Sequence, residues 1–250
     1  LRLFRNDPRI RFEGIIYETV RESVEAVCLA DRRLIRDTSV CIEHVGYDGD
    51  QSLKHRRNLA LLRRAVADRP DSAFYWSRLA ETLAALGERD AAVVAARNAV
   101  AIVRANDCRD EDPTVTVAYQ TLAALSAEAI EDRLAVIEEG LRAFPDNFAL
   151  RLARARGLID TGCLTDALAI IDGLVAIDPE AIRPYCAGHD VRIFGEFAHD
   201  LRGMALVRLE RFAEAAAAFE AAAAAAPHEL SYRAKAAAMR GHAMRTTPGA

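Results

Sequence analysis

The chain contains two kinds of hydrophobic pattern, and the change from one to the other lies near residue 50. After that point, apolar residues recur at every third or fourth position, which is the spacing of one face of an α-helix. Before it, short stretches rich in Phe, Ile, Val and Tyr are separated by a turn that contains proline, a pattern typical of β-strands. The sequence therefore predicts a mostly α protein with a small β remnant at its N-terminal end.

Prolines mark the expected ends of the helices, because a helix usually stops before a proline. Pro145 and Pro179 are 34 residues apart, Pro179 and Pro227 are 48 apart, and Pro70 precedes Pro145 by 75. Thirty-four residues is the period of the tetratricopeptide repeat (TPR). The longer steps equal one and two periods plus an irregular polar stretch, as expected for a repeat array with insertions at its joints.

The interior of the first complete unit, "FYWSRLAETLAALGERDAAVVAARNAVAIV", agrees with this period. The first helix has an apolar stripe of Trp76, Leu79, Ala80 and Leu83, and Gly87 breaks the helix. The second helix is lined by the small residues Ala92, Ala96 and Ala99. This pattern resembles the TPR, in which small residues let two antiparallel helices approach closely. The fold expected from this resemblance is a TPR-like α-α superhelix of antiparallel helix pairs.

The TPR-like array is predicted to occupy residues 48–250. Its expected parts are a leading half-repeat at 52–70, repeats at about 73–104, 113–145, 148–179 and 190–227, and a capping helix at 228–243. The units match the TPR pattern unevenly: Arg151 stands where Trp is usual, and Glu210 replaces the glycine of the turn. Several partial matches in one phase are more specific than any single one.

Residues 1–47 follow other rules. Strands are predicted for "RLFRN", "RFEGIIYETV" and "SVCIEHVGY", the first two joined by a tight turn at "DPR". Three strands without a covering layer do not form an independent domain. They are expected to pack on the helical array or on a preceding portion of the protein, since a chain that begins at Leu1 without Met looks like the end of a longer one.

A second resemblance covers about seventy positions. The stretches "RLFRNDPRIRFEGIIYE", "IEHVGY" and "KHRRNLALLRRAVADRPD" follow one another in this order. Together they resemble the closing part of family 2 glycosyltransferases that carry C-terminal TPRs. The resemblance implies an upstream GT-A domain, with a nucleotide-sugar donor and a divalent metal in the parent enzyme. No cofactor and no metal is expected in this chain, which would dock a protein or peptide acceptor or partner without catalysis of its own.

The resemblance also gives candidates for an active-site rim. Glu18 and His44 match the family's positions, whereas Tyr17 stands where relatives have histidine. A tyrosine is a poor substitute for a neutral imidazole as a metal ligand. His44 has an equally good alternative as a strand histidine paired with a carboxylate. The "DGD" of Asp48 to Asp50 resembles a metal-binding motif but follows the last predicted strand, so it is interpreted as a turn.

A repeat array usually offers a groove lined by the first helix of each pair. The TPR pattern places in this groove Ser77, Glu81, Gln120, Ala124, Leu152, Arg156, Asp200, Met204 and Arg208. This is a mixed surface, suited to an apolar or mixed peptide. The Lys/Asn set with which some TPR domains hold a carboxylate terminus is missing there, so no such binding is expected.

Composition narrows the function classes. The net charge of −4, from 33 basic and 37 acidic residues, gives no electrostatic reason to bind nucleic acid or anionic lipid. No charge-free apolar stretch reaches the length of a membrane span. The five cysteines form no CxxC pair, which favours buried thiols in a reducing, cytoplasmic setting over disulfides or zinc.

One alternative to the transferase reading stays open. The chain could be a stand-alone TPR adaptor or scaffold protein without transferase activity, in which residues 1–47 only cap the array. That alternative predicts that residues 48–250 fold and bind a partner alone. No other catalytic constellation is present in the sequence, and whether the parent of this chain is an active enzyme is left open.

Overall fold

A computed structural model of the chain describes residues 3–36, 51–106, 115–125, 129–182 and 190–246. These residues are predominantly helical. The chain forms two compact units, Leu1–Ile102 and Val103–Ala250. The predicted domain boundary between residues 47 and 48 lies outside the described residues and stays a prediction.

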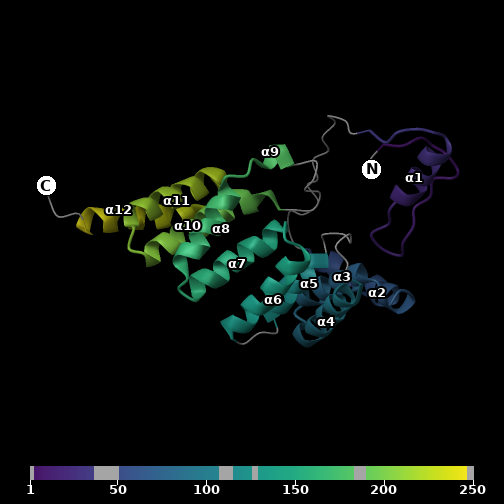
Figure 1. Cartoon of the computed structure of the whole chain (residues 1–250), viewed down its shortest axis with the longest axis horizontal. Coiled ribbons are helices and arrows are strands. Elements are labelled where there is room, and N and C mark those ends of the chain that lie inside the picture. The colour runs from purple at the N-terminus through teal and green to yellow at the C-terminus, as the bar shows by residue number, and fades with distance from the viewer. Residues whose placement is uncertain (1–2, 37–50, 107–114, 126–128, 183–189, 247–250) are drawn as a thin grey trace. The chain divides into compact units, whose positions relative to one another are not determined.

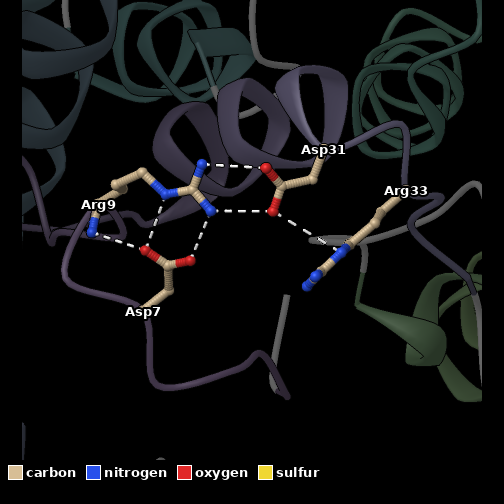
Figure 2. Close-up of polar contacts among 4 residues, drawn as sticks. All are labelled: Asp7, Arg9, Asp31 and Arg33. Atoms are coloured by element: carbon tan, nitrogen blue, oxygen red, sulfur yellow. Dashed lines mark hydrogen bonds and ion pairs between the residues drawn. The ribbon is translucent and has the colours of Figure 1, made fainter.

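The first unit begins with a turn that is fastened to a short helix, α1 (Arg21–Ala30). The backbone N–H of Ile10 donates to the carbonyl oxygen of Asp7 at 2.9 Å. Figure 2 shows the Arg9 guanidinium between Asp7, at 2.7 Å, and Asp31 at the end of α1, at 2.9 Å. The hydrogen bonds from Arg9 lower the pKa of Asp7 to about 2. Since the groups are exposed, they fix local geometry more than they stabilise the fold.

The strands predicted before α1 are not formed, and this corrects the sequence-based expectation. Within residues 3–36, pairing is limited to one isolated antiparallel bridge between Glu13 and Thr19, with N···O distances of 2.9 and 3.0 Å. Gly14 and Tyr17 have φ angles of 111° and 57° in the loop that the bridge closes. These left-handed conformations end the extended backbone that a strand requires. The third predicted strand lies outside the described residues.

After α1, the first unit contains α2 (Ser52–Asp68), α3 (Ala73–Ala85) and most of α4 (Arg89–Asn106). Helix α2 packs against α3. Leu62 of α2 and Ala80 of α3 are fully buried, and Leu79 is 5% exposed. Leu79, Ala80 and Leu83 of the apolar stripe predicted on α3 thus belong to the core of the unit, as their helical spacing requires, whereas Trp76 is only partly buried.

The second unit continues the series of helices. After the end of α4 it contains α5 (Thr116–Leu125), α6 (Ile130–Ala143), α7 (Phe148–Asp160), α8 (Leu164–Val175), α9 (Pro179–Ile182), the 3₁₀ turn η2 (Val191–Phe194), α10 (Glu196–Arg208), α11 (Phe212–Ala225) and α12 (Leu230–Thr246). The helices from α5 to α8 pack side by side in sequence order, and so do α10, α11 and α12 (Figure 1). This is the predicted TPR-like arrangement of antiparallel helix pairs.

Helix α3 of the first unit and helices α7 and α10 of the second unit end in the same way. The middle residue of each turn is left-handed, with φ angles of 80° at Gly87, 85° at Gly162 and 58° at Glu210. The next N–H in each turn donates to the carbonyl oxygen five residues earlier, for example from Glu88 to Leu83 at 2.9 Å. This is the Schellman motif, which reverses the chain within three residues. Glu210 adopts the backbone conformation of the glycine that it replaces.

Small residues let the paired helices approach closely. Ala155 on α7 and Ala205 on α10 are fully buried within the apolar core of the second unit. A Cβ added at Gly203 would lie 2.6 Å from Cζ of Phe219, which leaves room only for glycine. Phe194 also belongs to this core, and the centroid of its ring lies 4.9 Å from the ring centroid of Phe148. Close packing of this kind sets the spacing of the helices and therefore positions their outer faces.

Candidate functional site

The predicted groove begins on α3, where the structure corrects one of its residues. Ser77 is 1% exposed, because it lies one helical turn from the buried residues Ala73 and Ala80. It therefore belongs to the core rather than to an accessible surface. Glu81 remains partly exposed, and its carboxylate accepts a hydrogen bond from Nη1 of Arg78 at 2.9 Å.

A residue predicted for an active-site rim lies beside this face of α3. The ring of Tyr17 meets Phe74 edge-on, with centroids 5.7 Å apart. The guanidinium of Arg78 lies 5.4 Å from the centroid of Tyr17 and 5.5 Å from that of Phe74. Glu18 is exposed, and His44 lies outside the described residues. Within the first unit, the N-terminal segment thus covers part of α3.

The predicted groove residues of α5 and α7 form a mixed surface in the second unit. Ala124 and Arg156 are exposed, whereas Gln120 and Leu152 are partly buried. Leu152 packs against the apolar core of the unit. Helix α7 contacts both α5 and α10, so the first helices of successive pairs are neighbours. Among the described residues, Arg156 makes no ion pair, which leaves its charge available to a partner.

On α10, the predicted groove residues are already engaged. Asp200 accepts from Nζ of Lys235 on α12 at 2.5 Å, and Lys235 also lies 5.4 Å from the ring centroid of Tyr232. Burial raises the pKa of Tyr232, and the negative charge of Asp200 raises it further. Met204 packs into the core, and a guanidinium nitrogen of Arg208 contacts the carbonyl oxygen of Ile159. The capping helix therefore neutralises the acidic end of the predicted groove.

A different set of residues marks where the array departs from the repeat pattern. Nε1 of Trp76 on α3 donates to the carbonyl oxygen of Pro70 at 2.9 Å. On α7, Nε of Arg151 donates to the carbonyl oxygen of Pro145 at 3.0 Å, so arginine keeps the hydrogen bond of the missing indole. Three residues further along, Arg154 pairs with Glu138 of α6 at 2.5 Å.

Sequence reasoning recognised Arg151 as a departure but missed Arg154 and Lys235. Arg154 occupies the position that Leu79 holds in the first complete repeat, so a charged residue at an apolar position of the pattern is the signal that identifies it. Lys235 had no such signal. Its role depends on where α12 places it beside Asp200, and the sequence alone does not show this.

The described residues contain no group of three or more His, Cys, Asp or Glu side chains that could hold a metal ion. The candidate turn from Asp48 to Asp50 lies outside them. Cys28 is partly buried and Cys163 is exposed, and both are free thiols. In the part of the chain that the structure describes, no helix has both the length and the apolar character that crossing a membrane requires.

Solved structures share this architecture. A thermophilic TPR protein from Thermus thermophilus matches with a TM-score of 0.51 and 21% identity, covering 74% of this chain and 90% of that one. The TPR protein YrrB, described as having an unusual peptide-binding site, matches with a TM-score of 0.50 and 16% identity, covering 74% and 85%. No protein-family model and no curated protein sequence matches the chain. At these identities the likeness shows the fold, a TPR-like superhelix.

Proposed function

We propose that the chain is a protein-interaction module that binds a peptide segment of a partner along the first helices of its repeats. The observation that carries this proposal is the adjacency of α7 to α5 and α10, which brings Ala124, Leu152 and Arg156 onto neighbouring helices. A surface that combines apolar contact area with an available guanidinium suits a peptide with apolar and acidic side chains. The partner would be a protein or peptide rather than nucleic acid or membrane.

We further propose that this module is the C-terminal region of a family 2 glycosyltransferase, with an upstream GT-A domain as its intramolecular partner. Support comes from the sequence resemblance and from apolar side chains exposed on the N-terminal segment. Leu3, Phe12, Leu29 and Leu34 are between 69% and 83% exposed. Exposed apolar side chains of this size would gain free energy from burial against a partner domain. The nucleotide-sugar and divalent metal would belong to the parent, and this chain would dock its protein or peptide acceptor.

A stand-alone adaptor is the alternative, and one observation favours it. Tyr17 packs on Phe74 and Arg78, while Ile16 and Val20 are buried within the first unit. In that case the N-terminal segment belongs to the array and caps α3. Under either reading, the free thiols of Cys28 and Cys163 are compatible with a reducing compartment such as the cytoplasm.

The groove can be tested with peptides selected from a displayed random library against the whole chain. Binding should be lost in Leu152→Asp and Arg156→Glu, and it should be retained in Asp166→Lys, an exposed residue on α8. Selected peptides that bind all three variants equally would contradict the groove. Fluorescence anisotropy of the labelled peptides provides the measurement.

A different experiment distinguishes the transferase proposal from the stand-alone adaptor. In the transferase reading, the coding sequence upstream of Leu1 encodes a GT-A segment, and including it slows amide hydrogen exchange across residues 3–36. In the adaptor reading, no such segment precedes the chain. Absence of a GT-A segment would exclude the transferase proposal and leave the peptide groove untouched, so the two proposals fail separately.

A further inference from the structure

A pocket of about 450 Å³ lies in the second unit, between the second helices α6 and α8 and against α7. Its wall is apolar where Leu141 and Ile170 line it, and cationic where Arg151 and Arg154 line it. The volume lies within the range of about 300–1,000 Å³ typical of ligand pockets. The pocket is thus large enough for one or two side chains of a bound chain.

The pocket lies where α7 departs from the repeat pattern. Arg151 and Arg154 occupy the positions of Trp76 and Leu79, of which Trp76 is partly buried and Leu79 is 5% exposed in the first complete repeat. A Cβ added at Gly173 of α8, which also lines the pocket, would meet nothing within 4 Å. Two guanidinium groups and a residue without a side chain thus line this open space.

The two arginines are held in place but retain unused donors. Arg154 donates through Nε to Glu138 at 2.5 Å. Arg151 donates through Nε to the Pro145 carbonyl oxygen at 3.0 Å and through Nη2 to Asp146 at 2.9 Å. A guanidinium has five N–H donors, so most donors of the pair are free to bind a carboxylate from a partner.

We propose that this pocket binds an acidic peptide segment in which a Glu or Asp side chain neighbours an aliphatic one. The incoming carboxylate displaces Glu138 from Arg154, and the aliphatic side chain packs against Leu141 and Ile170. A phosphate is disfavoured because a dianion has no apolar group to pack against the wall formed by Leu141 and Ile170. This matching of one negative charge and one apolar group to the lining defines the class of ligand.

This site is separate from the proposed groove. On α7, Arg151 and Arg154 face the pocket, whereas Leu152 and Arg156 are offset from them by one and two residues along the helix. With about 100° of rotation per residue, these pairs lie on different faces of α7. One chain can therefore bind segments on both faces at once, and loss of one site does not imply loss of the other.

The first test uses a labelled Gly-Leu-Glu-Leu-Glu-Gly peptide and its counterpart with Gln for Glu, titrated onto the whole chain and followed by amide NMR. The acidic peptide should bind and shift resonances of α6, α7 and α8, and the Gln peptide should bind at least about tenfold more weakly. Arg154→Met should cause a similar loss. Glu138→Gln should tighten binding several-fold, because it removes the internal competitor of the ligand.

Two control variants test whether the loss of binding is specific to the pocket. Arg240→Met removes another exposed arginine, one that is paired with Glu220, and should leave binding unchanged. Gly173→Leu fills the pocket while raising helix propensity, so it should abolish binding in a chain that is still folded. The proposal is wrong if both peptides bind equally, if Arg240→Met weakens binding as much as Arg154→Met, or if the acidic peptide does not bind. Inorganic phosphate that binds at Arg154 in place of the peptide would also overturn it.

Discussion

Helices α3 and α7 begin in the same way and then present opposite chemistry. In both, the fourth residue donates a hydrogen bond to the carbonyl oxygen of the proline in the preceding turn, from Trp76 to Pro70 and from Arg151 to Pro145. Three residues later, α3 has the buried Leu79, whereas α7 has Arg154 in an ion pair. The backbone geometry of the repeat is thus kept while its apolar filling is replaced by charge.

The comparison shows which contacts fix the repeat and which are free to vary. Ala80 follows Leu79 on α3 and Ala155 follows Arg154 on α7, and both alanines are 0% exposed. Close approach of paired helices requires a small residue there, whatever the neighbouring side chains are. Positions that pack between pairs can instead become polar if they reach solvent or find a partner. A binding pocket can arise at such a position without loss of the fold.

The largest effect on stability is expected when the apolar and the charged side chain at the equivalent positions 79 and 154 are exchanged. Leu79→Arg places a guanidinium in a site that is 5% exposed, and we expect it to reduce the free energy of unfolding by about 4 kcal/mol or more. Arg154→Leu should change stability by no more than about 1 kcal/mol, since its ion pair is partly solvated. Urea unfolding followed by the fluorescence of Trp76, the single tryptophan, and by circular dichroism measures both.

The control for this exchange is Leu79→Met, which keeps the volume and should cost less than about 1.5 kcal/mol. Equal costs for Leu79→Arg and Arg154→Leu would contradict the comparison, because they would mean that both positions are filled to the same extent. The fluorescence signal should report mainly the first unit, which contains Trp76.

The sequence was sufficient to predict the helix pairs but not the N-terminal segment. Recurrent signals, such as Gly87, Gly162 and the spaced prolines, report local backbone geometry that each repeat must satisfy by itself. The stretch Arg11 to Val20 has the composition of a strand, but Gly14 and Tyr17 adopt left-handed conformations that end the extension. Residues that favour strands form one only when their backbone pairs with another strand, and within residues 3–36 this pairing is limited to one bridge.

The candidate site was predicted less completely, for a physical reason. Extrapolating the TPR pattern placed Ser77 in the groove, but helical spacing from Ala73 and Ala80 buries it. The engagement of Asp200 by Lys235 depends on tertiary packing 35 residues away. Periodicity predicts which face of a helix a residue occupies, whereas accessibility depends on what covers that face.

The N-terminal caps of α3 and α7 should contribute differently to stability, with smaller effects than the exchange at positions 79 and 154. Asn147, 5% exposed, accepts from the N–H of Leu150 at 2.9 Å and donates to Oγ1 of Thr116 at 3.0 Å. Ser72 accepts from the N–H of Tyr75 at 3.4 Å and is partly exposed. We expect Asn147→Ala to cost about 2 kcal/mol and Ser72→Ala about 0.5 kcal/mol. Equal losses in thermal unfolding would mean that burial of the cap does not matter.

The turns that follow the first helices should respond to substitution in opposite directions. Gly87→Ala and Gly162→Ala should each cost about 1 kcal/mol from the left-handed backbone alone, because an added Cβ meets nothing within 4 Å at either position. Glu210→Gly should stabilise the second unit by about 0.5 kcal/mol, since relief of strain is partly offset by unfolded-state entropy. Glu210→Asn, which tolerates the same conformation, should lie between Glu and Gly in urea unfolding.

The smallest effect concerns α10, in which His199 holds the position of Trp76 and Arg151. Burial lowers the pKa of this half-buried imidazole, and the positive charge of Arg202 lowers it further. Below the ordinary pKa of about 6.5, the unfolded chain therefore binds more protons at this residue than the folded chain does. The contribution of His199 to stability is present above that pH and is lost as the pH falls through the folded pKa. His199→Gln should remove this part of the pH dependence in circular dichroism unfolding of the second unit, while unfolding reported by Trp76 keeps its pH dependence. An unchanged pH profile of the second unit in His199→Gln would mean that the imidazole at this position is as well solvated as in the unfolded chain.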